Sequence, residues 1–369
     1  MNREEAITRG MEIHEINHSM KRRSPWHDYH RRGTYMLTLV IEGRVPLFGE
    51  LRGDTSAEPG SAAAPHVQLS ELGSTILREE IRKITKFYPQ VEVWKVCIMP
   101  DHIHMIVRVS EDLPRDKHLG IAIRGFKAGC TKAWWRLSGV ETPGTVTRNA
   151  APAPVPEVTS APITARAAAR ATVPEVSTSA PRPSLFEQGY NDKILLHEGQ
   201  LDTWKTYLDD NPRRLLLKRQ HPELFTVLHD MEIASRKCQI VGNRFLLNIP
   251  DKMAVIVHRR YTEEENARLR EEWLACGERG GVLVSAAIAP KEKEVLREAM
   301  NRGYRIILLR ENGFPRLYKP SGESFYACTE GRLLQISPWD FHMERKTITR
   351  SQCLSLNAMA ETIAGPTLT

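Results

Sequence analysis

The sequence predicts an α+β protein with two domains: a split βαβ (ferredoxin-like) domain followed by a small parallel α/β (Rossmann-like) domain. In the first half, segments rich in β-branched residues alternate with amphipathic segments in the order strand, helix, strand, strand, helix, strand. In the second half, three apolar strand segments are separated by helices. The 369 residues are enough for two cores of ordinary size.

The first half begins with a predicted strand over 34–43. A helix ending before Pro89 follows, and its apolar stripe has steps of four, three and four: Leu77, Ile81, Ile84 and Tyr88. Two strands, 91–99 and 102–109, are joined by a turn at Pro100, which predicts an antiparallel pair.

A long helix is predicted next, with a stripe at steps of four and three: Leu119, Ile123, Phe126, Cys130, Ala133 and Leu137. Beyond it we expect a strand over 185–196 and a helix over 198–212 that ends near Pro212. The helices of the split βαβ arrangement are expected on one face of an antiparallel sheet, with this last helix appended.

The second half contains predicted strands at 253–260, 281–288 and 305–312. Two helices between them have terminal signals: the capping box of Thr262 with Glu265, then Pro290 at the start and Gly303 after the end. No GxGxxG follows a strand, so the dinucleotide fingerprint is missing. A ligand of such a sheet is expected beyond the strand ends, near 285–290 and 310–314.

Composition shifts divide the chain further. We expect a basic amino-terminal arm over 1–33, the first domain over 34–230, the second over 231–345 and a tail over 346–369. Two stretches dominated by small and polar residues cannot bury enough apolar surface to order themselves, and they are predicted to be disordered inserts in the first domain: 53–70 and 139–183.

The overall charge is mildly positive. Lysine and arginine number 52 against 45 acidic residues, a net charge of +7, and the pI is about 9.1, which favours a polyanionic partner such as nucleic acid. The six cysteines are far apart, which favours neither a zinc ribbon nor a disulfide framework. Neither a signal-peptide pattern nor an uncharged apolar run of membrane-spanning length occurs, so we expect a cytoplasmic, nucleoid-associated protein with no membrane partner.

Two histidines stand one residue apart in the strand predicted at 102–109. Residues i and i+2 of a strand point to the same face, so His102 and His104 would project together while Ile103 points away. This is the geometry of a two-histidine metal clamp. The alternative is an accidental pair, which a chain with 13 histidines readily produces.

A second constellation lies about a hundred residues later. On a helix, Tyr207 and Asn211 would share one face at i and i+4. Two imidazoles and an amide oxygen form an incomplete shell for Mg²⁺ or Mn²⁺, with open positions for phosphate oxygens, and a metal there would favour attack by the phenol. The alternative for Tyr207 is a helix residue that packs with Trp204.

Together the motifs resemble the HUH transposases with a single catalytic tyrosine, particularly the REP-associated tyrosine transposases. The matching stretches, in family order, read "MPDHIHMIV", "LGIAIRGFKAGCTKAWW" and "LFEQGYNDKILLHEGQLDTWKTYLDDNP". The resemblance covers about 34–222 and departs from the pattern in Leu208, where isoleucine is usual. Asn211 also directly precedes Pro212, which disfavours helical geometry.

The resemblance implies a metal-dependent endonuclease and strand transferase acting on single-stranded DNA, often beside a hairpin. His102 and His104 would bind Mg²⁺ or Mn²⁺, Asn211 would supply the third ligand, and Tyr207 would be the nucleophile that forms a 5′-phosphotyrosyl link. Tyr190 is a rival nucleophile. Some relatives exchange the tyrosine helix between subunits and others act as monomers, so a homodimer remains open.

Further DNA contacts are predicted on basic segments. The long helix presents Arg124, Lys127, Lys132 and Arg136, beside Trp134 and Trp135, which offer stacking surfaces. The arm adds Arg22 and Arg23 in a cluster interleaved with aromatic residues. The alternative for each is an ordinary solvated surface.

Two other functions are consistent with the same residues. One is a catalytically silent, domesticated binder of DNA hairpins, and the other is an unrelated metal-dependent phosphodiesterase acting on RNA. The second half faintly resembles the Rossmann-like domain of DNA-processing protein A over 281–309, and an accessory interaction domain is the alternative there.

Overall fold

The computed structural model describes residues 27–139, 183–315, 318–344 and 347–365. The chain forms two compact units, Met1–Arg213 and Arg214–Thr369. The boundary therefore falls earlier than the expected one after residue 230. The predicted insert at 139–183 lies almost wholly outside the described residues, as does most of the predicted arm with Arg22 and Arg23.

The first unit is built on a four-stranded antiparallel sheet with the strand order β4-β5-β1-β6. The predicted pair on either side of Pro100 is confirmed, because β4 and β5 are neighbours in antiparallel register. The last predicted strand is much shorter than expected. The strands are β1 (Gly33–Val40), β4 (Val91–Met99), β5 (His102–Val109) and β6 (Asn191–Ile194).

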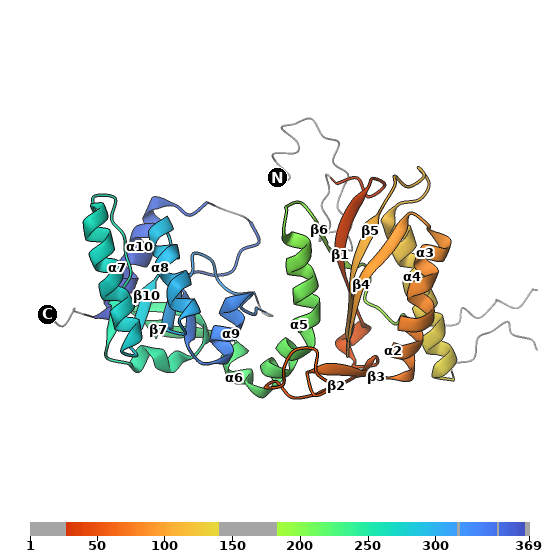
Figure 1. Ribbon diagram of the computed structural model, residues 1–369, viewed down its shortest axis with the longest axis horizontal. Coiled ribbons are helices and arrows are strands. Elements are labelled where there is room, and N and C mark those ends of the chain that lie inside the picture. The colour runs from red at the N-terminus through yellow and green to blue at the C-terminus, as the bar shows by residue number, and fades with distance from the viewer. Residues whose placement is uncertain (1–26, 140–182, 316–317, 345–346, 366–369) are drawn as a thin grey trace, which may run out of the picture. The chain divides into compact units, whose positions relative to one another are not determined.

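Helices cover both faces of this sheet (Figure 1). Alternate residues of β1 and β5 pack into the larger core, which includes residues of the two long helical segments. The remaining residues, including Met36 and Ile106, pack against Trp204 and Leu208 of α5 (Gln200–Gln220). On the larger-core side lie α2 (Glu71–Thr75), η3 (Ile76–Glu80), α3 (Ile81–Phe87) and α4 (Leu119–Leu137).

The expected stripe of the first helix is wrong at one position. Leu77 is 43% exposed, whereas its neighbour Ile76 is fully buried. The segment η3 is a π-helical turn, whose extra residue shifts the phase of the stripe. The stripe of α4 is confirmed except at its last residue, Leu137, which is 37% exposed.

The stretch predicted as a disordered insert at 53–70 is instead an ordered ribbon. Strands β2 (Gly49–Arg52) and β3 (His66–Leu69) pair antiparallel, and the Asp54 amide donates to the Ala63 carbonyl at 2.8 Å. The Arg213 guanidinium donates to two carbonyl oxygens of the connecting loop. Small and polar residues are ordered here because backbone hydrogen bonds replace an apolar core.

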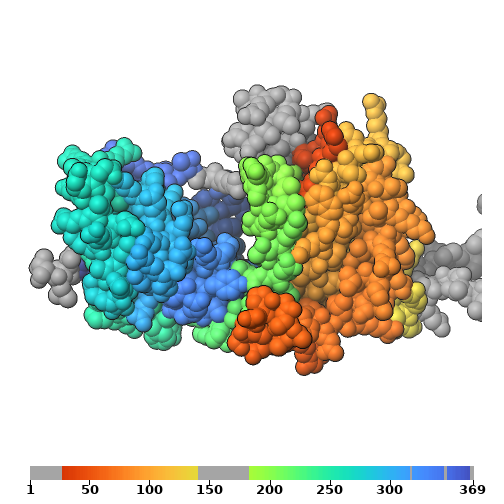
Figure 2. All heavy atoms as spheres, viewed as in Figure 1, coloured from red at the N-terminus to blue at the C-terminus, as the bar shows by residue number. Residues whose placement is uncertain are grey.

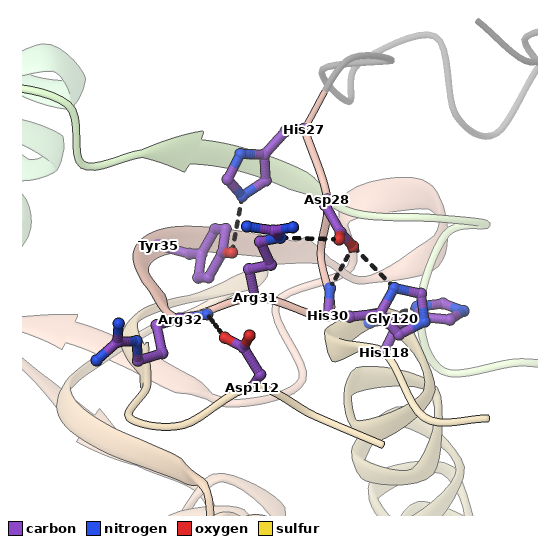
Figure 3. A network of polar contacts seen from close by, with 9 residues as sticks. All are labelled: His27, Asp28, His30, Arg31, Arg32, Tyr35, Asp112, His118 and Gly120. Atoms are coloured by element: carbon purple, nitrogen blue, oxygen red, sulfur yellow. Dashed lines mark hydrogen bonds and ion pairs between the residues drawn. The ribbon is translucent and has the colours of Figure 1, made fainter. Parts of the chain in front are cut away.

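The end of the predicted arm is also part of the unit (Figure 3). His27 Nε2 lies 2.8 Å from the Tyr35 hydroxyl, and the Arg32 amide donates to Asp112 at 2.9 Å. His30 Nδ1 lies 2.8 Å from Asp28 Oδ1. Residues 27–32 are therefore held against the start of β1 by side-chain and backbone bonds.

The second unit contains a six-stranded mixed sheet in the order β7-β8-β12-β11-β10-β9. Strands β9, β10, β11 and β12 are parallel, which confirms the three predicted parallel strands, and β8 pairs antiparallel with β12. Neither β12 nor the pair β7 and β8 was predicted. The bounds are β7 (Leu228–Ile233), β8 (Arg236–Gly242), β9 (Lys252–Ala254), β10 (Val282–Ser285), β11 (Arg305–Leu309) and β12 (Leu333–Ser337).

Helices pack into two cores of this second unit, and its predicted capping box at Thr262 is confirmed. The expected tail at 346–369 contains α10 (Arg350–Ala364), whose Leu356 and Met359 are buried in one core. None of the helices in the described ranges combines the length and apolar character needed to cross a bilayer. The other helices are η2 (Glu42–Arg44), α6 (Pro222–Phe225), η4 (Arg244–Asn248), α7 (Glu263–Glu278), α8 (Pro290–Asn301) and α9 (Glu323–Thr329).

Candidate active site

The two histidines lie on the face of the sheet that α5 covers. His102 and His104 are on β5 with Ile106, which packs against α5, whereas Ile103 and Met105 pack into the larger core on the other face. The alternation predicted from the sequence therefore holds. His104 is 7% exposed, and the side chain of His102 is 16% exposed.

The imidazole rings converge through the same nitrogen. His102 Nε2 and His104 Nε2 are 3.2 Å apart, with ring centroids 4.7 Å apart and ring planes at 87°. Two nitrogen ligands about 2.1 Å from one cation lie roughly 3.0 Å apart at a right angle and roughly 3.4 Å apart at the tetrahedral angle. The observed separation falls between these values.

The opposite ring nitrogens are each held by a neighbouring polar group. His102 Nδ1 lies 2.6 Å from Asp101 Oδ1, and His104 Nδ1 lies 2.8 Å from the Thr38 hydroxyl. An ionised carboxylate only accepts, so the His102 Nδ1–H donates to Asp101; in the neutral ring this tautomer has its lone pair on Nε2. The Thr38 hydroxyl can accept from His104 in the same way. Such partners orient metal-binding histidines in other proteins.

Asp101 is held in its ionised form. Its burial opposes ionisation, but the hydrogen bond from His102, together with the guanidinium of Arg44 at 3.2 Å, outweighs burial and lowers the pKa of the Asp101 carboxyl. Cys97, which is paired with His104 across β4 and β5, behaves differently. Burial, with a smaller contribution from Asp209, raises the pKa of its thiol to about 12, so a thiolate ligand is not expected there at neutral pH.

Tyr207 reaches this histidine pair from α5. Its ring centroid is 5.7 Å from that of His104, with the planes at 73°. Helix α5 is held against the sheet by buried Trp204 and Leu208, and Lys95 Nζ of β4 lies 2.6 Å from Asp209 Oδ1. In Figure 2 the green atoms of α5 lie against the red and orange atoms of the first unit. The sequence prediction that histidines and tyrosine form one constellation thus has a geometric counterpart.

Asn211 lies on the buried side of α5, because it continues the spacing of Trp204 and Leu208 at steps of four and three. The helix runs through Pro212 to Gln220, so the expected end near Pro212 is wrong. Proline removes one backbone donor, which leaves the Leu208 carbonyl without its helical partner but does not end the helix. Asn211 is 3% exposed, and its Nδ2 has no hydrogen-bond partner among the described residues.

The rival nucleophile Tyr190 lies on the other face of the sheet. It is 7% exposed and belongs to the larger core with Tyr35 and Leu37. Burial is the main reason that the pKa of the neighbouring Tyr35 is raised. The sheet separates Tyr190 from the histidine pair, whereas Tyr207 shares their face.

Three polar residues of this face were not identified from the sequence. Thr38 and Asp101 contact the histidines, and Asn191 lies directly across from Thr38 in the pairing of β1 with β6. A row of four paired residues therefore crosses the sheet beneath α5: Cys97, His104, Thr38 and Asn191. Thr38 could have been found from the period of two along β1, but the row depends on strand order, which distant segments determine.

The predicted basic DNA contacts of α4 are not brought together with the histidines. Helix α4 lies on the larger-core side of the sheet, and Arg124, Lys132 and Arg136 are exposed there. Lys127 instead donates to the carbonyls of Glu187 and Gly189 at 2.6 and 2.8 Å. That lysine therefore supports a loop, which the prediction of DNA contact overlooked.

The strand-end segment predicted to hold a ligand in the second unit contains a buried carboxylate. Glu292, which is 2% exposed, accepts from the amides of Val257, Ile288 and Ala289 at 2.9, 2.7 and 3.1 Å. Ser285 donates to the Val255 carbonyl at 2.7 Å. These hydrogen bonds connect the segments that follow β9 and β10, so the carboxylate of Glu292 and the hydroxyl of Ser285 stabilise the fold.

The donor set fits a divalent cation only in part. No cluster of three or more His, Cys, Asp or Glu side chains suited to a metal occurs in the described part of the chain. The histidine pair supplies two donors. The buried Asn211 amide, four residues after Tyr207 on α5, is a polar group of a type outside that set. Rotation of this amide by 180° exchanges its nitrogen and oxygen, so its oxygen can occupy the position of the unpartnered Nδ2.

No family model matches the chain. An uncharacterized protein of Haemophilus influenzae is 27% identical over 139 residues, which cover 33% of this chain and 70% of that protein. A REP-associated tyrosine transposase bound to a REP hairpin has a TM-score of 0.27 and 13% identity, over 50% of this chain and 70% of the other.

Two further structures are similar to parts of the chain. DNA processing protein A from Helicobacter pylori, described with its single-stranded DNA binding mode, has a TM-score of 0.26 and 19% identity over 34% of this chain and 56% of its own. A proposed transposase from Deinococcus radiodurans R1 has a TM-score of 0.24 and 10% identity, over 50% of this chain and 94% of the other. TM-scores of this size establish no shared fold, so function is inferred below from the residues of this chain.

Proposed function

We propose that the first unit is a metal-dependent endonuclease and strand transferase acting on single-stranded DNA, with Tyr207 as its nucleophile. The observation that carries this proposal is the convergence of two Nε2 atoms at 3.2 Å, with the centroid of the Tyr207 ring 5.7 Å from that of the His104 ring. When each Nδ1 carries its proton, both Nε2 lone pairs point to one position, where a cation can bind to both; without a cation, one Nε2 carries a proton and donates to the other. The three matching stretches in family order support the same assignment.

His102, His104 and Asn211 would hold the metal, for which Mg²⁺ and Mn²⁺ are the candidates. Imidazole nitrogen is a softer donor than the oxygen ligands that Mg²⁺ prefers, so this set favours Mn²⁺. The bound ion would supply positive charge to the scissile phosphate. Asp101 and Thr38 orient the two rings, and α5 positions Tyr207 beside them.

The proposed step is a transesterification. The Tyr207 phenol loses its proton to solvent, its oxygen bonds to phosphorus, and the bond from phosphorus to O3′ breaks. The O3′ atom takes a proton from solvent, which leaves a free 3′-hydroxyl and a 5′-phosphotyrosyl link. Attack by a 3′-hydroxyl reverses the exchange without an external energy source, because one phosphoester replaces another.

An adduct assay tests this function. Wild-type protein and 5′- or 3′-labelled hairpin oligonucleotides with single-stranded flanks are incubated with Mn²⁺ and separated under denaturing conditions. A protein-linked band with the 3′ label alone is expected, and it should disappear in Tyr207→Phe and in His104→Ala but persist in Tyr190→Phe. Cleavage without a protein-linked product would indicate a phosphodiesterase, and salt-sensitive binding without cleavage would indicate a silent hairpin binder. Either outcome would refute the proposal.

A further inference from the structure

A groove runs between α3 and α4 on the face of the first unit opposite to the histidine pair. Its volume is about 640 Å³, within the range of small-ligand sites. Its floor includes small residues of α4, and Phe87 and Tyr88 lie along its wall. Phe87 is 65% exposed, an unusual position for a phenylalanine.

Lysines surround this apolar floor. Lys83, Lys117 and Lys132 line the groove, and among them Lys83 is neutralised by the buried Glu80 at 2.6 Å. Lys117 lies over the Tyr88 ring, with its Nζ 5.8 Å from the centroid. The groove therefore combines ammonium groups with aromatic surface, the pairing that binds phosphates and unpaired bases.

The positive charge continues beyond the groove along the same layer of helices. Helices α2, η3, α3 and α4 expose seven basic side chains but only two acidic ones, Glu71 and Glu79. The basic residues are Arg78, Arg82, Lys83, Lys86, Arg124, Lys132 and Arg136. Charge spread along two helices matches the repeated phosphates of a polymer better than one acidic peptide.

We propose that the groove between α3 and α4 binds a second stretch of single-stranded DNA, outside the histidine and tyrosine site. The identity of the polymer rests on the proposed function. Bases lie on the apolar floor and against Phe87, while Lys117 and Lys132 contact phosphates. A duplex cannot use the floor, because its bases are stacked and paired, so the groove distinguishes single strands from double strands.

Gly125 allows the groove to be filled without disturbing the core. A Cβ built at Gly125 meets no atom within 4 Å, whereas one at Gly129 would collide with Glu80. Gly125→Leu therefore places a side chain into the groove and also raises helix propensity. Gly125→Ala is the matched control, since it gains helix propensity but adds only one carbon.

Binding of fluorescein-labelled dT20 is measured by anisotropy in the Tyr207→Phe protein with EDTA, so that neither metal nor covalent chemistry contributes. Gly125→Leu, Phe87→Ala and the double change of Lys117→Glu with Lys132→Glu should each weaken binding about tenfold or more. The double change should also reduce the log–log salt slope by about 1.4, since two phosphate contacts are lost. Gly125→Ala should bind as its parent does.

The charge control is Lys237→Glu, which reverses an exposed lysine of the second unit. Unchanged dT20 affinity in Gly125→Leu and in the double variant would overturn the proposal and leave the groove to a protein partner. Equal affinity for a 20-base-pair duplex would overturn it as well. Because adduct formation plays no part in this readout, a missing adduct would refute the proposed function without affecting this result.

Discussion

The carboxylate of Asp101 should determine how tightly the histidine pair binds a divalent cation. Its Oδ1 lies 2.6 Å from His102 Nδ1, and both side chains are largely shielded, with exposed fractions of 21% and 16%. Loss of such an orienting group costs roughly 10- to 100-fold in metal affinity. That range corresponds to about 1.4 to 2.7 kcal/mol.

Two substitutions at Asp101 separate its hydrogen bond from its charge. Asp101→Asn keeps an acceptor for the His102 Nδ1 proton but removes the charge, so we expect affinity near the tenfold end of that range. Asp101→Ala removes both and should approach a hundredfold loss. The dissociation constant for Mn²⁺ is measured by isothermal titration calorimetry, with circular dichroism to confirm folding.

Asp209→Asn is the matched control, because it makes the same chemical change at a carboxylate that is 67% exposed and contacts Lys95 rather than a histidine. It should alter Mn²⁺ affinity less than twofold, since exposed ion pairs contribute little. Wild-type affinity in both Asp101 variants would refute the orienting role. A loss far beyond a hundredfold would refute it too, since it would make Asp101 a direct ligand.

Three further predictions concern stability. Leu208→Ala should lower the free energy of unfolding of the first unit by about 2 to 4 kcal/mol, because Leu208 is 1% exposed in the small core under α5. Urea titrations measure this change, and an effect below about 0.5 kcal/mol would contradict that packing. Gly242→Ala should destabilise the second unit by at least about 2 kcal/mol, because φ of Gly242 is +112° and a Cβ there would lie 2.2 Å from the Leu333 carbonyl oxygen. Hydrogen exchange measures this loss, and amide protection equal to that of the wild type would contradict it. Mn²⁺ at a hundred times its dissociation constant should raise the free energy of unfolding of the wild type by about 2.7 kcal/mol, and EDTA should abolish this effect. The free energy of unfolding of His104→Ala should not change, and equal stabilisation of both proteins would place the metal elsewhere.

The parts of the fold that depend on local patterns were predicted from the sequence. The alternation along β5 assigned His102 and His104 to one face, and the turn at Pro100 gave the pairing of β4 with β5. Capping signals likewise identified the start of α7 at Thr262. Each of these features is set by residues within a few positions of one another.

Features that depend on distant segments were missed. The position of α5 on the other face of the sheet follows from Met36 and Ile106, which are far from Trp204 in sequence. The ribbon at β2 and β3 contains few apolar residues, and Arg213 supports it from α5. The polar row that joins His104 to Asn191 likewise requires the strand order.

The sequence selected the main residues of the candidate site but not the groups that contact them. The pattern selected Tyr207 over Tyr190, and the structure gives a physical reason, since only Tyr207 shares the face of the histidines. Thr38 and Asp101 carry no motif of their own. Their roles depend on contacts with ring nitrogens that a sequence does not specify.

Mass-spectrometric mapping of the covalent protein–DNA adduct tests the central claim most directly. After cleavage of a single-stranded oligonucleotide with Mn²⁺, nuclease trimming and proteolysis, the nucleotide should be attached to the peptide that contains Tyr207. Attachment to the peptide containing Tyr190, or to no tyrosine, would contradict the claim that the face shared by the histidines and α5 performs the chemistry.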